Sequence, residues 1–75
     1  MRRIIDDLLY DTNTAELVFT EEGTNRMLYR TPNGNFFTFY PTGEIRPKSL
    51  EDTKDYLGRN DVKKYIELFG KPKEA

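Results

Sequence analysis

The chain has 75 residues, a formal net charge of −1, 36% hydrophobic and 33% charged residues, and neither cysteine nor histidine. A chain of this length makes one small domain, because it buries only about 60% of the surface that its unfolded form exposes. The missing Cys and His exclude disulfides, thiolate or imidazole metal sites and His-dependent nucleophilic catalysis, so the small core depends on five Phe and five Tyr.

The first 25 residues are expected to form an N-terminal β-ribbon. The segments Leu8–Asp11 and Ala15–Thr20 have the composition of strands and flank the turn-forming pair Thr12-Asn13. Leu17 and Phe19 share one face of the second strand, because side chains alternate along a strand. These two segments are therefore predicted to pair with each other, and a polar loop then leads into the middle of the chain.

The middle of the chain is expected to be a three-stranded meander over residues 26–47. Two turns of the same pattern, x-Pro-x-Gly-x, occupy 31–35 and 40–44. Proline presets φ at the first corner, and glycine supplies the left-handed residue of a bulge, so each turn predicts a three-residue hairpin loop. The strands should cover roughly 26–31, 35–40 and 44–47.

These loops also set the register of the meander, and a one-residue slip would invert every side chain. The bulged register places Tyr29 opposite Phe37, Met27 opposite Phe39, and Phe39 opposite Ile45. That apolar face is the predicted core face. The opposite face carries a mixture of basic, aromatic and polar side chains: Arg26, Leu28, Arg30, Phe36, Thr38, Tyr40 and Arg46.

The C-terminal third is predicted to form two helices over 49–70, followed by a frayed tail at 71–75. Ser49 is a suitable N-cap, and Gly58 fits the C′ position of the first helix. Asn60 or Asp61 then caps a second helix. The apolar stripe of that helix has period 3.6 and consists of Val62, Tyr65, Ile66 and Phe69.

The predicted fold class is therefore α+β. An antiparallel β-sheet of four to five short strands is followed by two C-terminal α-helices that pack on one face. We expect the helical stripe to meet the face of Phe37 and Phe39. No apolar run exceeds three residues, so we expect no membrane span and no signal peptide, and a cytoplasmic protein.

Four segments follow one another along the chain: YDTNTAEL, LYRTPNGNFF, Ile45-Arg46-Pro47 with the acidic helix after it, and YIELFG. In this order they resemble a family of small phage and mobile-element proteins of Firmicutes. The resemblance spans most of the chain, although many family members carry longer inserts after the first ribbon and after the Phe-Phe strand. It implies no catalytic residues. It does imply a context in which small accessory proteins bind and inhibit a host machine, as anti-CRISPR proteins do.

The segment that begins at the first turn matches part of a calcium-binding loop. Asp11, Asn13 and Glu22 match the first, third and last positions of a calcium-binding loop. Ala15 and Glu16, however, occupy the places of a ligand and of the glycine that makes the sharp turn. Asp11 is better explained as the residue of an Asx turn, so we expect no metal site.

Three aspartates near the N-terminus are candidates for acid–base catalysis. Asp6, Asp7 and Asp11 supply carboxyl groups that can act as an acid–base pair, but a core of this size has little room for a deep pocket. Ser49 has no histidine to activate it, and the scattered glycines form no phosphate-binding loop. We therefore expect no enzyme activity and no cofactor.

Two surfaces are candidate binding sites. The first is the mixed sheet face, whose Arg, Tyr and Phe side chains are typical of interface hot spots and also stack on single-stranded nucleic acid: Arg26, Leu28, Arg30, Phe36, Tyr40 and Arg46. A local alternative is that Arg30 only packs over Phe36. The second surface is an acidic patch: Asp6, Asp7, Asp11, Glu16, Glu21 and Glu22.

The function expected from these features is binding rather than chemistry. A host or phage protein is the expected partner, and the context implied by the resemblance adds inhibition of a host defence factor. The alternative is a nucleic-acid-binding module on the mixed face, although the overall charge is unfavourable for strong binding to DNA. The sequence indicates no oligomeric state.

Overall fold

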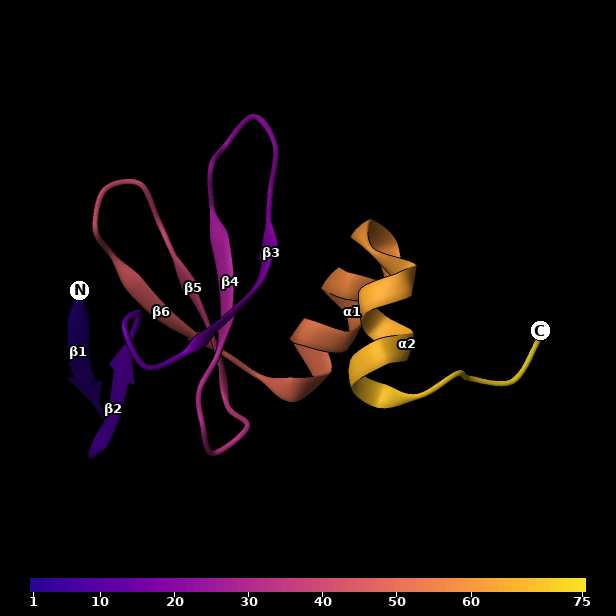
Figure 1. Ribbon diagram of the computed structural model, residues 1–75, viewed down its shortest axis with the longest axis horizontal. Coiled ribbons are helices and arrows are strands. Elements are labelled where there is room, and N and C mark those ends of the chain that lie inside the picture. Colours follow the sequence, from indigo (N-terminus) through magenta and orange to yellow (C-terminus); the bar gives the residue numbers. More distant parts are fainter.

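The computed structural model describes all 75 residues and contains six strands followed by two helices (Figure 1). The elements are β1 (Arg2–Ile5), β2 (Leu8–Asp11), β3 (Glu16–Thr20), β4 (Met27–Arg30), β5 (Phe36–Phe39), β6 (Ile45–Lys48), α1 (Leu50–Asn60) and α2 (Val62–Phe69). The fold class is α+β with antiparallel strands, as the sequence predicts. Neither helix has the length and apolar character needed to cross a membrane.

Strands β3 to β6 form one antiparallel sheet in chain order. The predicted register of the meander is confirmed: Tyr29 lies opposite Phe37, and Phe39 lies opposite both Met27 and Ile45. Glycine has positive φ in both turns, +87° at Gly34 and +92° at Gly43, which is the left-handed conformation that the turn pattern requires. Local turn chemistry therefore determines the register of this sheet.

The predicted N-terminal β-ribbon is wrong in its pairing. Strand β2 pairs with β1 in a separate two-stranded sheet, and β3 pairs with β4. The reason is the Asp6-Asp7 turn, in which both residues have positive φ, 52° and 64°. Two such residues in succession form the type I′ turn of a two-residue hairpin, and aspartate tolerates this conformation.

The expected alternation in β3 is also wrong. The register of β3 against β4 shifts between Leu17 and Phe19, which marks a β-bulge at Val18. The bulge turns Val18 into the core, where it is 7% exposed, and leaves Leu17 at 49%. Phe19 packs beside Val18 against the helices.

The larger sheet is covered on both faces, and each cover makes its own core (Figure 1). On one face the β1–β2 hairpin packs Tyr10 against Phe37 and Ile45. On the other face the helices pack on the core formed by Val18, Leu28, Phe36 and Leu57. The sheet is therefore the middle layer, with the hairpin on one side and the helices on the other.

The expectation that the helices cover the Phe37 face is therefore wrong. The hairpin occupies that face, with the Tyr10 ring edge-on to Phe37 at 5.5 Å between centroids. The helices pack instead on the opposite face, where the ring centroids of Phe69 in α2 and Phe36 in β5 lie 5.9 Å apart. Half of the predicted helical stripe stays outside the core, because Val62 is 59% and Ile66 is 36% exposed.

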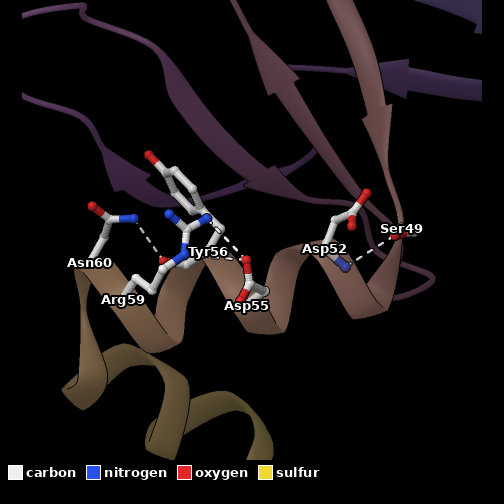
Figure 2. A network of polar contacts seen from close by, with 6 residues as sticks. All are labelled: Ser49, Asp52, Asp55, Tyr56, Arg59 and Asn60. Carbon is white, nitrogen blue, oxygen red and sulfur yellow. Dashed lines mark hydrogen bonds and ion pairs between the residues drawn. The ribbon is translucent and has the colours of Figure 1, made fainter.

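Capping fixes both helices. Ser49 Oγ accepts a hydrogen bond from the Asp52 backbone N–H at 3.1 Å, as predicted for an N-cap (Figure 2). Asp61 caps α2 in the same way, through the Lys64 N–H at 3.0 Å. The predicted end of the first helix at Gly58 is wrong, because α1 continues to Asn60.

Two hydrogen bonds stabilise the last turn of α1, beyond Gly58. The Asn60 side-chain amide donates to the Tyr56 carbonyl at 2.8 Å (Figure 2), and the Asp61 N–H donates to the Leu57 carbonyl at 2.8 Å. These bonds satisfy carbonyl groups of the last helical turn without a left-handed residue. The second helix ends at Gly70 as expected, and residues 71–75 form no regular secondary structure.

Candidate functional site

The mixed face of the sheet is only partly available. Leu28 and Phe36 are 3% and 4% exposed, because the helices pack directly on them. The interpretation of these two residues as exposed binding residues is therefore wrong. Arg30 is exposed, but its guanidinium lies near the Gly34 turn, beside the covered end of this face. The alternative interpretation, in which Arg30 packs over Phe36, has no counterpart among the cation–π contacts of the structure.

The other three predicted residues of this face do come together. The guanidinium carbons of Arg26 and Arg46 lie 5.2 Å and 5.5 Å from the centroid of the Tyr40 ring. Arg46 Nε also donates a hydrogen bond to a Glu44 carboxylate oxygen at 2.6 Å, and this hydrogen bond raises the pKa of Arg46 above its usual value. Two cations, one from β6 and one from the residue just before β4, thus gather around one aromatic ring.

A second tyrosine adjoins this group and was missed by the sequence analysis. Tyr56 of α1 donates from its hydroxyl to Glu21 Oε1 at 2.7 Å, and the ammonium of Lys48 lies 4.7 Å from the Tyr56 ring centroid. Figure 2 shows the Tyr56 side chain projecting from α1 toward the strands. Its ring packs edge-on against Phe19, which fixes its position.

The polar contacts of this second tyrosine shift two pKa values in opposite directions. Burial, followed by the hydrogen bond to Glu21, raises the pKa of the Tyr56 hydroxyl well above its usual range. Hydrogen bonds from Thr24 and then from Tyr56 lower the pKa of Glu21. At neutral pH the tyrosine therefore stays protonated, and the glutamate keeps its negative charge.

Together these side chains form one surface, which we call the Tyr40 cluster: Glu21, Arg26, Tyr40, Arg46, Lys48 and Tyr56. Five of its members, all except Arg46, line a hollow of about 50 Å³. That volume holds a few water molecules and is far below the roughly 300–1,000 Å³ of small-molecule sites. The cluster is therefore suited to a macromolecular surface rather than to a small ligand.

The charges of the Tyr40 cluster are only partly compensated. Arg46 is paired with Glu44, but Arg26 and Lys48 form no salt bridge with any carboxylate. Arg26, Arg46 and Lys48 carry three positive charges, and Glu21 and Glu44 carry two negative charges. Arg26 and Lys48 thus lack a salt-bridge partner, although both lie close enough to Glu21 to attract its carboxylate, and the net charge of the group is small.

The six residues of the acidic patch do not form one surface. Asp6 and Asp7 lie in the β1–β2 turn at the lower left of Figure 1, whereas Glu21 and Glu22 lie in the β3–β4 loop at the top of the view. Asp11 is 7% exposed. Glu16, in β3, lies opposite Arg30.

The first turn holds the Asx arrangement that the sequence predicts. Asp11 Oδ1 accepts a hydrogen bond from the Asn13 N–H at 2.9 Å. Glu22 belongs to a different loop, so the chain does not wrap a calcium loop here. Nowhere in the protein do three or more acidic side chains gather closely enough to hold a metal ion.

No protein family, no curated protein and no solved structure matches this chain. The geometry of the Tyr40 cluster is therefore the basis for a functional proposal.

Proposed function

We propose that this protein acts by binding another protein, and that the Tyr40 cluster is the contact surface. The observation that supports this proposal most is the pair of guanidinium groups held against one tyrosine ring, at 5.2 and 5.5 Å. Arginine and tyrosine are enriched among the residues that contribute most to protein interfaces. Rings and guanidiniums that are already held in place lose less side-chain entropy on binding.

The charges indicate the chemistry of the partner. Arg26 and Lys48 have no salt-bridge partner, and they flank two tyrosine rings. A protein surface that offers carboxylates beside apolar side chains would satisfy both features. The resemblance to phage and mobile-element proteins supports a host factor as this partner and inhibition of that factor as the outcome of binding.

Single-stranded nucleic acid is the alternative partner, since it also binds to Arg and aromatic side chains. Two features of the cluster favour a protein instead. Two guanidinium groups already lie over the Tyr40 ring, so a base that stacks on this ring has to compete with them. In addition, Glu21 and Glu44 place two negative charges among the cations, which weakens attraction to phosphates.

The test is an affinity pull-down from a Firmicute lysate, with and without nuclease, followed by titration of the captured partner. We expect a protein that is retained after nuclease treatment. Tyr40→Ala should weaken its binding by about tenfold or more, as removal of a hot-spot side chain does. Arg26→Glu should act in the same direction.

The matched control is Arg30→Glu, an exposed arginine four residues along the same face but outside the cluster. This variant should bind normally. Equal loss in Arg26→Glu and Arg30→Glu, or no loss in Tyr40→Ala, would remove the Tyr40 cluster from the proposal. A partner that disappears with nuclease and whose affinity falls steeply with salt would establish the nucleic-acid alternative.

A further inference from the structure

Strand β1 has a free edge. It pairs only with β2, in a two-stranded sheet of their own, and no strand lies on its other side. Figure 1 shows β1 as the outermost element at one end of the molecule. A free edge presents unpaired backbone groups that can pair with another strand.

The pairing pattern identifies which backbone groups face this edge. The Thr12 N–H donates to the Met1 carbonyl at 3.0 Å, so these opposed residues form a hydrogen-bonded pair. Hydrogen-bonded and non-hydrogen-bonded pairs alternate along antiparallel strands. The pairs of Arg3 with Tyr10 and of Ile5 with Leu8 are therefore bonded, and the N–H and C=O of Ile4 point away from β2.

The side chain of the same residue is also exposed. Ile4 is 71% exposed, and Leu9, directly opposite it in the hairpin, is 52% exposed. Natural edge strands usually carry a charged residue, a proline or a bulge where they could pair with another chain. β1 does begin with Arg2 and Arg3, but its centre, where the backbone groups of Ile4 point outward, carries an apolar, β-branched side chain, which favours strand pairing.

We propose that the protein forms a two-fold symmetric dimer in which the β1 edges of two copies pair antiparallel, centred on Ile4. In this register Ile4 lies opposite Ile4 of the second copy, and each donates its outward N–H to the carbonyl of the other. The hairpins then join into a four-stranded sheet in the order β2, β1, β1, β2. The exposed apolar side chains form one continuous row across it, from Leu9 to Leu9.

Charge complementarity selects a second copy as the occupant and selects this register. Centring on Ile4 brings Arg2, at the start of β1, near the Asp6-Asp7 turn that follows β1 in the other copy, and the two-fold symmetry repeats this contact. Centring one residue earlier would place Arg3 opposite Arg3, and directly opposed like charges are destabilising. The hairpin edge is thus complementary to itself, because β1 begins with two basic residues, continues with two apolar ones and is followed by an acidic turn.

The contact is small, because each strand has four residues. Small interfaces are typical of weak, transient complexes, so the dimer should depend on concentration and on salt. Sedimentation velocity of the protein alone, from low micromolar to millimolar concentration, is the direct measurement. We expect the average mass to rise from that of one copy toward that of two.

Two substitutions at the centre of the edge separate pairing from hydrophobicity. Ile4→Pro removes the outward N–H but no hydrogen bond within the hairpin, whereas Ile4→Thr keeps the N–H and loses apolar surface. Loss of the two symmetry-related hydrogen bonds should weaken the Ile4→Pro dimer by about tenfold relative to Ile4→Thr. Circular dichroism melts establish that both variants are folded.

Changes of charge test the register. Arg2→Asp should weaken the dimer, and so should Asp6→Asn, which removes the carboxylate but keeps a side chain that tolerates the positive φ of this turn. Arg30→Asp makes the same charge change as Arg2→Asp on a different strand and should leave the dimer unchanged. A wild-type protein that stays monomeric at millimolar concentration, or an Ile4→Pro variant that dimerises as well as Ile4→Thr, would overturn the proposal.

Discussion

Replacing Tyr10 by alanine should destabilise the protein substantially, because the β1–β2 hairpin is one of the two layers that cover the sheet. Tyr10 is 6% exposed, and its ring lies edge-on to Phe37, which is fully buried. Truncating a buried aromatic side chain to alanine costs about 3–5 kcal/mol through lost burial and the cavity that remains. A 75-residue domain has roughly 4–11 kcal/mol of total stability, so the variant should lose a large part of it.

Urea denaturation followed by circular dichroism measures this loss. Leu9→Ala is the matched control, since it changes the neighbouring residue on the opposite face of the same strand. Leu9 is 52% exposed, so its truncation should change stability by less than about 1 kcal/mol. If the free energies of unfolding of the two variants agree, the hairpin does not pack on the sheet and the two-sided core is wrong.

Three further predictions concern stability. Gly58→Ala should stabilise the protein by about 0.5–1 kcal/mol, because the glycine lies inside α1. A new Cβ there would contact only a Tyr65 ring carbon, at the ordinary distance of 3.9 Å. Gly34→Ala, at a φ of +87°, should destabilise it in the same thermal melts, and a stabilising effect there would contradict the turn assignment. Hydrogen bonds from Thr24 and then from Tyr56 lower the pKa of Glu21 in the folded state below its usual 4.5. These hydrogen bonds therefore stabilise the folded protein fully above pH 4.5. Their stabilising effect is lost as the pH falls through the pKa of Glu21 in the folded state. The stability difference between wild type and Glu21→Gln should therefore shrink in acid. Glu22→Gln is the control, because it makes the same change in the same loop at a side chain that forms no hydrogen bond with Thr24 or Tyr56.

The meander was predictable from sequence because its information is local. Each x-Pro-x-Gly-x turn specifies its own dihedral angles, and once Gly34 and Gly43 are in place every cross-strand pair follows. Ser49 and Asp61 likewise act on backbone N–H groups three residues away. Interactions of this range are visible in a short stretch of sequence.

The hairpin was missed because its turn lacks a glycine. Asp6 and Asp7 look like charges that interrupt an apolar segment, yet both adopt positive φ and close a two-residue turn. Asn-Gly or Asp-Gly is the stronger signal for such a turn, and a pair of aspartates is ambiguous. Once the hairpin is overlooked, the Phe37 face has no other cover, and the helices are assigned to the wrong side.

Periodicity identifies the face of a residue but not its depth under a neighbouring layer. Leu28 and Arg30 share one face of β4, as the sequence predicts, and Arg26 directly precedes this strand. Only the helices decide that Leu28 is buried while the two arginines stay exposed. The separation of this face into a covered end and an open end is a tertiary effect, and no strand pattern contains it.

Two members of the Tyr40 cluster, Lys48 and Tyr56, were not predicted from the sequence. Lys48 continues the alternation that begins at Arg46, so extending β6 by one residue would have placed it on this face. Tyr56 had no such signal, because it precedes the buried Leu57 by one position and contributes through a hydrogen bond to Glu21, 35 residues earlier. That contact ties the helix to the β3–β4 loop and holds Tyr56 beside Lys48. The Tyr40 cluster at the open end of the sheet therefore includes a side chain from the helical layer that covers the other end.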